Sequence, residues 1–193
     1  MNGYNDMREK CFAVIDTETT WDNQVMSIGV VIADKDTKEV IDAYYFVITP
    51  ECEIGGMYSN VLYMQEIKKI AKNNRAIVIG EIDKLLKKNG VKRILAYNAC
   101  FDKKHLPELN SYTWCDIMRL AAYRQYNSKI PNHIECCSTG KMKSGYGVEP
   151  ILRMLSQNSY YTETHNAYFD ALDELKIVQL LEHDLEKYDL AMV

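Results

Sequence analysis

The sequence has no long apolar run, no Cys-x-x-Cys pair and no excess of basic residues. A membrane-spanning helix needs about 20 mostly apolar residues in succession, so no membrane segment is expected. Residues 1–10 are polar and carry charges of both signs, which argues against a signal peptide. We therefore expect a cytoplasmic protein, in which the six cysteines would be free thiols.

The net charge of −4 argues against a broad, non-specific nucleic-acid-binding surface. It does not argue against an enzyme that grips one strand end through metal ions and a local groove. No internal repeat or domain linker is visible, and 193 residues are enough for one domain with its own core. We therefore expect residues 1–193 to form a single domain.

Apolar stretches bounded by turn residues predict the secondary structure. Strands are expected at residues 11–16, 24–34, 39–48, 91–98 and 112–115, the first three forming an antiparallel meander. Helical spacing predicts helices at residues 61–71, 76–88, 101–106, 117–126, 148–158 and 165–188. The expected fold is α/β, with a mixed five-stranded sheet of three antiparallel strands and then parallel strands, flanked by helices.

The stretch FAVIDTETT, residues 12–20, ends an apolar strand with two carboxylates, Asp16 and Glu18. Residues two apart on a strand point to the same face, where like charges repel and raise each other's pKa. A hard divalent cation such as Mg²⁺ prefers oxygen ligands and would relieve that repulsion. The alternative is that Asp16 begins a turn and Glu18 is solvated.

Two further acids follow apolar segments. Asp102 ends the stretch ILAYNACFD, where a helix N-cap is the alternative role. Asp170 follows His165 by five residues, or about 140° around a helix at roughly 100° per residue. We therefore expect His165 at or before the first helical turn and Asp170 in the helix body. Asp173 and Glu174, one turn on, are expected to be solvated or capping charges.

Three motifs, in this order, resemble those of the DEDDh-type 3′–5′ exonucleases: FAVIDTETT, ILAYNACFDKKHL and ETHNAYFDALDE. This is the ribonuclease-H-like family of DNA-polymerase proofreading subunits and ribonuclease T. The resemblance spans roughly residues 12–181. Asn166 occupies the position where the sister class has Tyr, so the His subtype is indicated. The chain departs from the family at Tyr97, where many members have His, and in the segment 51–60, which lacks a His-Gly-Ile-like turn.

The resemblance implies a metal-dependent 3′–5′ exonuclease that releases nucleoside 5′-monophosphates from DNA or RNA. Two Mg²⁺ ions, replaceable by Mn²⁺, would stabilise the attacking and leaving oxygens. The implied metal ligands are Asp16, Glu18, Asp102 and Asp170. His165 would be the general base, because imidazole exchanges protons near neutral pH.

The resemblance also implies a substrate site for single-stranded or 3′-overhang nucleic acid. Thr17 and Glu18 would hold the 3′-hydroxyl, and Asn98 and Phe101 would line the groove; for Phe101 a core position is the alternative. A catalytically inactive nuclease-fold binding module is disfavoured, because four converging carboxylates repel phosphate unless a metal is bound. A proofreading subunit of a polymerase complex and a homodimer stay open, as does the choice between DNA and RNA.

Residues 127–147 lack periodicity and are interpreted as a long loop insertion, a feature that is often functional or mobile. His133, Cys136 and Cys137 offer zinc-ligand chemistry. Adjacent cysteines cannot easily both point at one tetrahedral ion, and no fourth ligand is evident, so loop residues without a metal are favoured.

The same loop contains Lys141, Lys143 and Tyr146, which would suit contact with a nucleic-acid strand. With 14 tyrosines in the chain, one Tyr near a Lys carries little weight, and a solvated face is the favoured interpretation.

Overall fold

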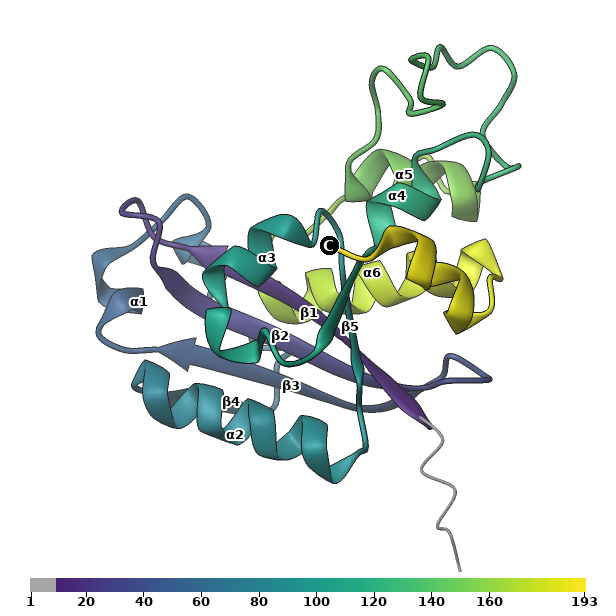
Figure 1. Ribbon diagram of the computed structural model, residues 1–193. Helices are drawn as coiled ribbons and strands as arrows, with labels where there is room; N and C mark the ends of the chain where they lie inside the picture. Colours follow the sequence, from purple (N-terminus) through teal and green to yellow (C-terminus); the bar gives the residue numbers. More distant parts are fainter. Residues whose placement is uncertain (1–9) are drawn as a thin grey trace, which may run out of the picture.

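A mixed sheet forms the centre of the computed structural model, which describes residues 10–193 (Figure 1). The strands are β1 (Cys11–Thr19), β2 (Val25–Asp34), β3 (Val40–Ile48), β4 (Ile70–Asn73), β5 (Arg93–Ala96) and β6 (Thr113–Asp116), in the order β4-β3-β2-β1-β5-β6. β1 to β3 are antiparallel, and β4, β5 and β6 each run parallel to a neighbour. The predicted sheet type is confirmed, with six strands in place of five. The expectation that no signal peptide is present concerns residues 1–10, which lie almost wholly outside the described residues.

The additional strand is β4, which begins inside the segment predicted as a helix at residues 61–71. That helix prediction is wrong. The segment holds one short 3₁₀ turn, Ser59–Val61, and then β4, which pairs with the outer edge of β3. Its apolar Ile67 packs against Tyr45 and Val47 of β3. β4 satisfies backbone groups that an edge strand would leave unpaired, and this tertiary gain outweighs the local helical spacing.

The helices agree more closely with the sequence. They are α1 (Glu51–Ile54), α2 (Arg75–Lys88), α3 (Cys100–His105), α4 (Ile117–Ala121), α5 (Val148–Ser156) and α6 (Ala167–Leu181), with 3₁₀ helices η2 (Pro107–Leu109) and η3 (Leu185–Ala191). The helix predicted over residues 165–188 ends earlier, because Glu182 adopts a left-handed conformation with φ 58°. Within residues 10–193, no helix is both long and apolar enough to span a membrane.

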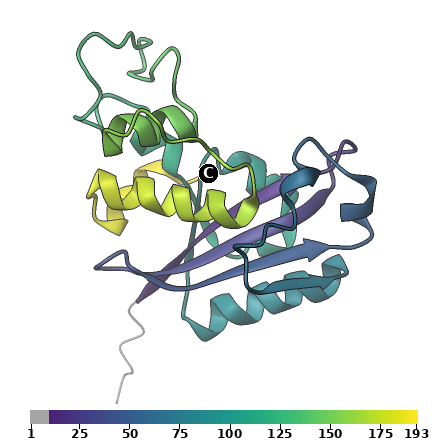
Figure 2. The same ribbon diagram turned by 180° about the vertical axis from the view of Figure 1, so that it is seen from behind.

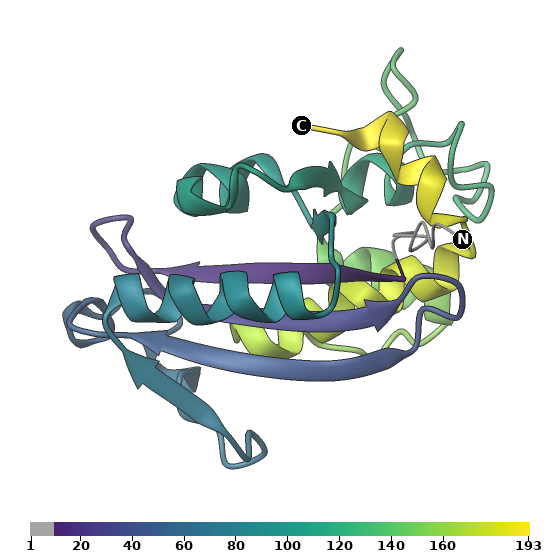
Figure 3. The same ribbon diagram turned by 60° about the horizontal axis from the view of Figure 1, so that its bottom comes forward.

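Two layers of helices cover the sheet. One core packs α4, α5, α6 and η3 against one face, and Figure 2 shows α6 in front of the strands. The other core packs α2, η2 and the residues around α3 against the opposite face, and Figure 3 shows α2 running alongside the strands. Successive β1 residues enter the two cores alternately, as strand geometry requires: Phe12 and Val14 face α6, and Ala13 and Ile15 face α2.

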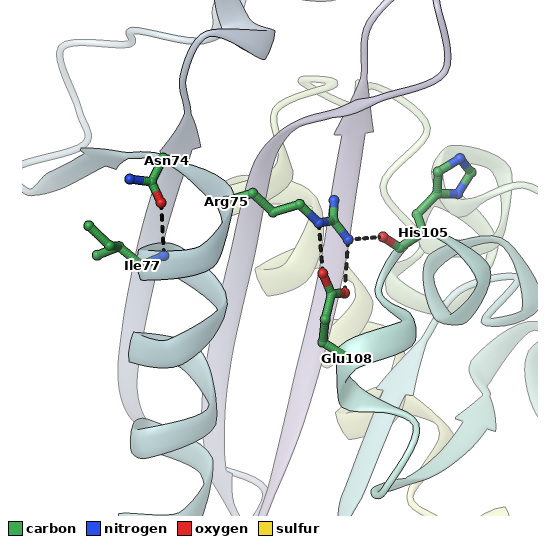
Figure 4. Close-up of polar contacts among 5 residues, drawn as sticks. All are labelled: Asn74, Arg75, Ile77, His105 and Glu108. Carbon is green, nitrogen blue, oxygen red and sulfur yellow. Dashed lines mark hydrogen bonds and ion pairs between the residues drawn. The ribbon is translucent and has the colours of Figure 1, made fainter.

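An ion pair joins the start of α2 to the segment after α3 (Figure 4). Arg75 Nε and Nη2 donate to the two carboxylate oxygens of Glu108 at 2.8 and 2.9 Å, and Nη2 also donates to the carbonyl oxygen of His105 at 2.6 Å. Next to Arg75, the Asn74 side chain caps α2 by accepting from the Ile77 amide at 3.1 Å. The two-point contact between Arg75 and Glu108 holds the C-terminal end of α3 in a defined orientation.

Candidate functional site

Three carboxylates meet at the end of β1. Oxygens of Asp16, Glu18 and Asp170 all lie within 4.8 Å of one another, Asp16 and Glu18 coming from β1 and Asp170 from the first turn of α6. A glycine makes this approach possible: Gly29 pairs with Asp16 across β1 and β2, and a Cβ on it would lie 1.8 Å from the Ala167 carbonyl oxygen. The start of α6 can therefore lie directly on the sheet, which brings Asp170 to β1.

Asp102 approaches the same strand end from the other face of the sheet. Its side chain is 2% exposed, and its Oδ1 accepts a hydrogen bond of 2.8 Å from the Thr17 hydroxyl. Among the described residues, it is not part of the three-carboxylate group. Its charge nevertheless raises the pKa of both Asp16 and Glu18. Asp102 lies in the first turn of α3, whose N-cap residue is Ala99, so it does not cap that helix.

The electrostatics of the centre favour a cation. Burial and neighbouring carboxylates raise the pKa of Glu18 to about 8 and that of Asp170 to about 8. Burial likewise raises the pKa of Asp102 to about 7, although the Thr17 hydrogen bond acts in the opposite direction. Asp16 Oδ2 and Asp170 Oδ1 are buried and lack a hydrogen-bond partner in the described part of the chain. Buried oxygens of this kind fit the ligand preference of a hard divalent cation.

His165 lies beside this centre, just before α6, as its spacing from Asp170 predicts. A ring nitrogen lies within 4.8 Å of carboxylate oxygens of Asp170 and Glu163. The ring stacks on Tyr58, with centroids 4.2 Å apart and planes 13° from parallel. The next residue, Asn166, caps α6 by accepting from the Tyr168 amide at 3.0 Å and donates to the Val61 carbonyl at 2.7 Å. The chain directly after the imidazole is thus held at the start of α6 and against the Ser59–Val61 turn.

The two groove residues expected from the sequence lie on the turn between β5 and α3 and on α3 itself. Asn98 is exposed and has a φ of 62°, and its amide donates to Asp116 Oδ1 at 2.9 Å. Phe101 is 38% exposed, so the core alternative for this residue is wrong. Its ring centroid lies 4.2 Å from that of His105.

Two acids next to the centre, Glu174 and Glu163, were not predicted from the sequence to belong to the site. The expectation that Glu174 is solvated or capping is wrong: it is 1% exposed, and burial with the charges of Asp16 and Asp102 raises its pKa well above the usual value. Its spacing of four from Asp170 puts the two on one helix face, a signal that was available in the sequence. Glu163 is half-buried beside His165, and burial is the main reason that its pKa is raised.

Within residues 10–193, His133, Cys136 and Cys137 do not come together as a group of possible metal ligands. No disulfide joins the six cysteines, all of which lie in this described range.

No protein-family model matches the sequence, and no curated protein matches it significantly. Solved structures match through the fold. The nuclease domain of 3′hExo, a DEDDh family member bound to rAMP, has a TM-score of 0.65 at 15% identity, over 100% of this chain and 98% of that one. Exonuclease X with 5′-overhanging duplex DNA has a TM-score of 0.54 at 19% identity, over 93% and 98%.

Escherichia coli Exonuclease I in complex with single-stranded DNA has a TM-score of 0.60 at 16% identity, over 94% of this chain. The match covers 42% of that longer chain. The chain therefore has the fold of the DEDDh 3′–5′ exonucleases, as its three motifs predicted.

Proposed function

We propose that this protein is a metal-dependent 3′–5′ exonuclease that releases nucleoside 5′-monophosphates from the 3′ end of DNA or RNA. The observation that carries the proposal is the convergence of Asp16, Glu18 and Asp170 beside His165, where buried oxygens of Asp16 and Asp170 have no hydrogen-bond partner among residues 10–193. Such a cluster costs folding stability without a cation, and the DEDDh fold supports nuclease chemistry as its use.

Asp16, Glu18 and Asp170, with Asp102 from α3, would hold two divalent cations, Mg²⁺ or in its place Mn²⁺. When bound, the cations would neutralise the carboxylates and stabilise the oxygens that gain charge in an in-line displacement at phosphorus. The ligands come from β1, α3 and α6, so a correctly packed sheet is needed before the four carboxylates can act together.

His165 is the proposed general base. It would take a proton from the attacking water, whose oxygen forms a bond to phosphorus while the bond to the 3′-oxygen of the preceding nucleotide breaks. The terminal nucleotide leaves as a 5′-monophosphate, and the shortened strand keeps a 3′-hydroxyl. The stack on Tyr58 supports this role, because a base must be held in one orientation toward the proton it removes.

The proposed substrate is a single-stranded or 3′-overhang end, consistent with the ligands of the similar nucleases. Glu18 and the backbone at Thr17 would receive the 3′-hydroxyl, which favours ends over internal bonds. The exposed Asn98 and Phe101 would border the path of the strand beside Asp102. The described sheet and helices would act together with residues 1–9 as one exonuclease domain.

The test offers 5′-labelled single-stranded DNA, single-stranded RNA and a mismatched duplex, each with Mg²⁺ or Mn²⁺. We expect a ladder that shortens one nucleotide at a time from the 3′ end, and no ladder with EDTA. Asp16→Ala should abolish digestion, and His165→Ala should leave a small residue of activity. Internal cuts by the wild type, or full activity in Asp16→Ala, would overturn the proposal. Tight binding without cleavage in either metal would favour the inactive binding module.

A further inference from the structure

Backbone hydrogen bonds order part of the loop that follows α4. The Met142 amide donates to the Ala122 carbonyl at 2.9 Å, and the Arg124 amide donates to the Gly140 carbonyl at 3.0 Å. These bonds make residues 122–124 and 140–142 antiparallel neighbours, with Tyr123 directly opposite Lys141. Met142 is 5% exposed and belongs to the main core, so this part of the loop is anchored to the body of the protein.

Two cation–aromatic pairs, each with one exposed and one partly buried member, involve this ladder, the end of α4 and the residues before α5. Lys141 Nζ lies 4.1 Å from the ring centroid of Tyr146, and the Arg119 guanidinium lies 5.8 Å from that of Tyr123. Because Tyr123 and Lys141 are directly opposite, their side chains leave the same face of the small ladder. We call Arg119, Tyr123, Lys141 and Tyr146 the loop platform. Tyr146 as a whole is 38% exposed, with Lys141 over its ring.

A tyrosine joins the loop platform to the acidic centre. The Tyr97 hydroxyl donates to the Tyr146 carbonyl oxygen, and Tyr97 directly precedes the groove residue Asn98. The Asn98 amide donates a hydrogen bond to Asp116 Oδ1. Burial raises the pKa of that carboxyl, and the positive charge of Lys141 acts in the opposite direction. The loop platform therefore begins where the proposed groove ends, and it places cations at the border of a negatively charged site.

We propose that the loop platform binds the single strand on the 5′ side of the terminal nucleotide, with a base stacked on Tyr146 and a phosphate paired with Lys141. Alternating cations and aromatic rings are a usual device for sequence-tolerant binding of single strands. The cations of the platform would also offset part of the repulsion that the phosphates of the strand meet at the carboxylates when no metal is bound. The inference rests on the proposed function for the identity of its ligand.

Fluorescence anisotropy with a 5′-labelled twelve-nucleotide single strand tests the loop platform, with Ca²⁺ replacing Mg²⁺ and the strand checked to be intact afterwards. We expect Lys141→Gln and Tyr146→Ala each to raise Kd about tenfold. Lys141→Gln should also reduce the slope of log Kd against log salt concentration by the amount expected for about one phosphate contact. Tyr146→Phe keeps the ring and should bind like the wild type. Lys143→Gln is the matched control, because Lys143 lies in the same loop but pairs with Glu135 at 3.0 Å.

A second substrate separates this inference from the proposed function. The p-nitrophenyl ester of thymidine 5′-monophosphate reaches only the acidic centre, so Tyr146→Ala should hydrolyse it at the wild-type rate while losing activity on the longer strand. Unchanged binding by both platform variants, or no wild-type binding, would overturn the platform even if digestion occurs. Platform-dependent binding without any hydrolysis would overturn the proposed function and leave the platform standing.

Discussion

Two groups of charged side chains lie at opposite ends of α3, and they differ in whether their charges are paired. At the C-terminal end, Arg75 meets Glu108 through two hydrogen bonds and lowers the pKa of that carboxyl. At the N-terminal end, Asp102 joins a region of negative charge in which burial and repulsion raise the pKa of Glu18 and Asp170 to about 8.

The difference separates a structural ion pair from a candidate binding centre. A paired, partly exposed charge stabilises the fold modestly. Buried like charges destabilise it until a cation or proton arrives, and strongly perturbed carboxyls of this kind gather at functional sites. The same helix therefore has one end fixed by Arg75 and at the other places Asp102 beside buried carboxylates.

The largest effect is expected from Asp170→Asn. This change keeps the side-chain shape and removes one negative charge, so metal-dependent digestion should fall more than about a hundredfold, the upper end of losses seen when only outer-shell partners are removed. In EDTA at pH 9, the same variant should unfold at a higher temperature than the wild type, because repulsion is relieved. Thermal melting and the 3′-end assay check both, with the exposed Asp36→Asn as control. Wild-type digestion by Asp170→Asn would show that the unpaired acids are not the working centre.

A pH series in EDTA tests the raised pKa values of Glu18 and Asp170. Since the folded-state pKa of Glu18 and of Asp170 is about 8, against ordinary values of 4.5 and 3.8, the folded protein binds more protons than the unfolded chain between these limits. The stability from these groups is complete below about pH 4 and is lost as pH rises through about 8. The advantage of Asp170→Asn in unfolding temperature should therefore grow from pH 5 to pH 9, and saturating Mg²⁺ should reverse it. A constant difference across this range would contradict the raised pKa values.

The smallest effect is expected at the paired end. Arg75→Lys keeps the charge but loses the two-point contact with Glu108, so the free energy of unfolding should fall by about 1 kcal/mol. Urea denaturation measures it. The control is Lys87→Ala, whose ion pair with Asp83 is exposed and should be worth less than about 0.5 kcal/mol. A larger loss for Lys87→Ala than for Arg75→Lys would mean that the α2–α3 contact does not hold α3.

Several features of the fold and of the candidate site could be predicted from local sequence patterns. The alternation in β1 predicted that Asp16 and Glu18 share a face, and the five-residue spacing predicted His165 at or before the first turn of a helix whose body contains Asp170. The three motifs predicted the family fold through their resemblance to the DEDDh exonucleases. These features depend on neighbours within a few positions, which a sequence displays directly.

Contacts between distant segments decided the rest. Residues 61–71 have helical spacing, yet Ile70–Asn73 form a strand, because they pair with the edge of β3. Glu174 was expected to be solvated, but it is buried because α6 packs on β1, an approach that Gly29 permits. Local sequence thus sets which carboxylates the chain can offer and on which faces they lie. How deeply they are buried and which of them meet depends on packing, because burial and repulsion involve elements far apart in the chain.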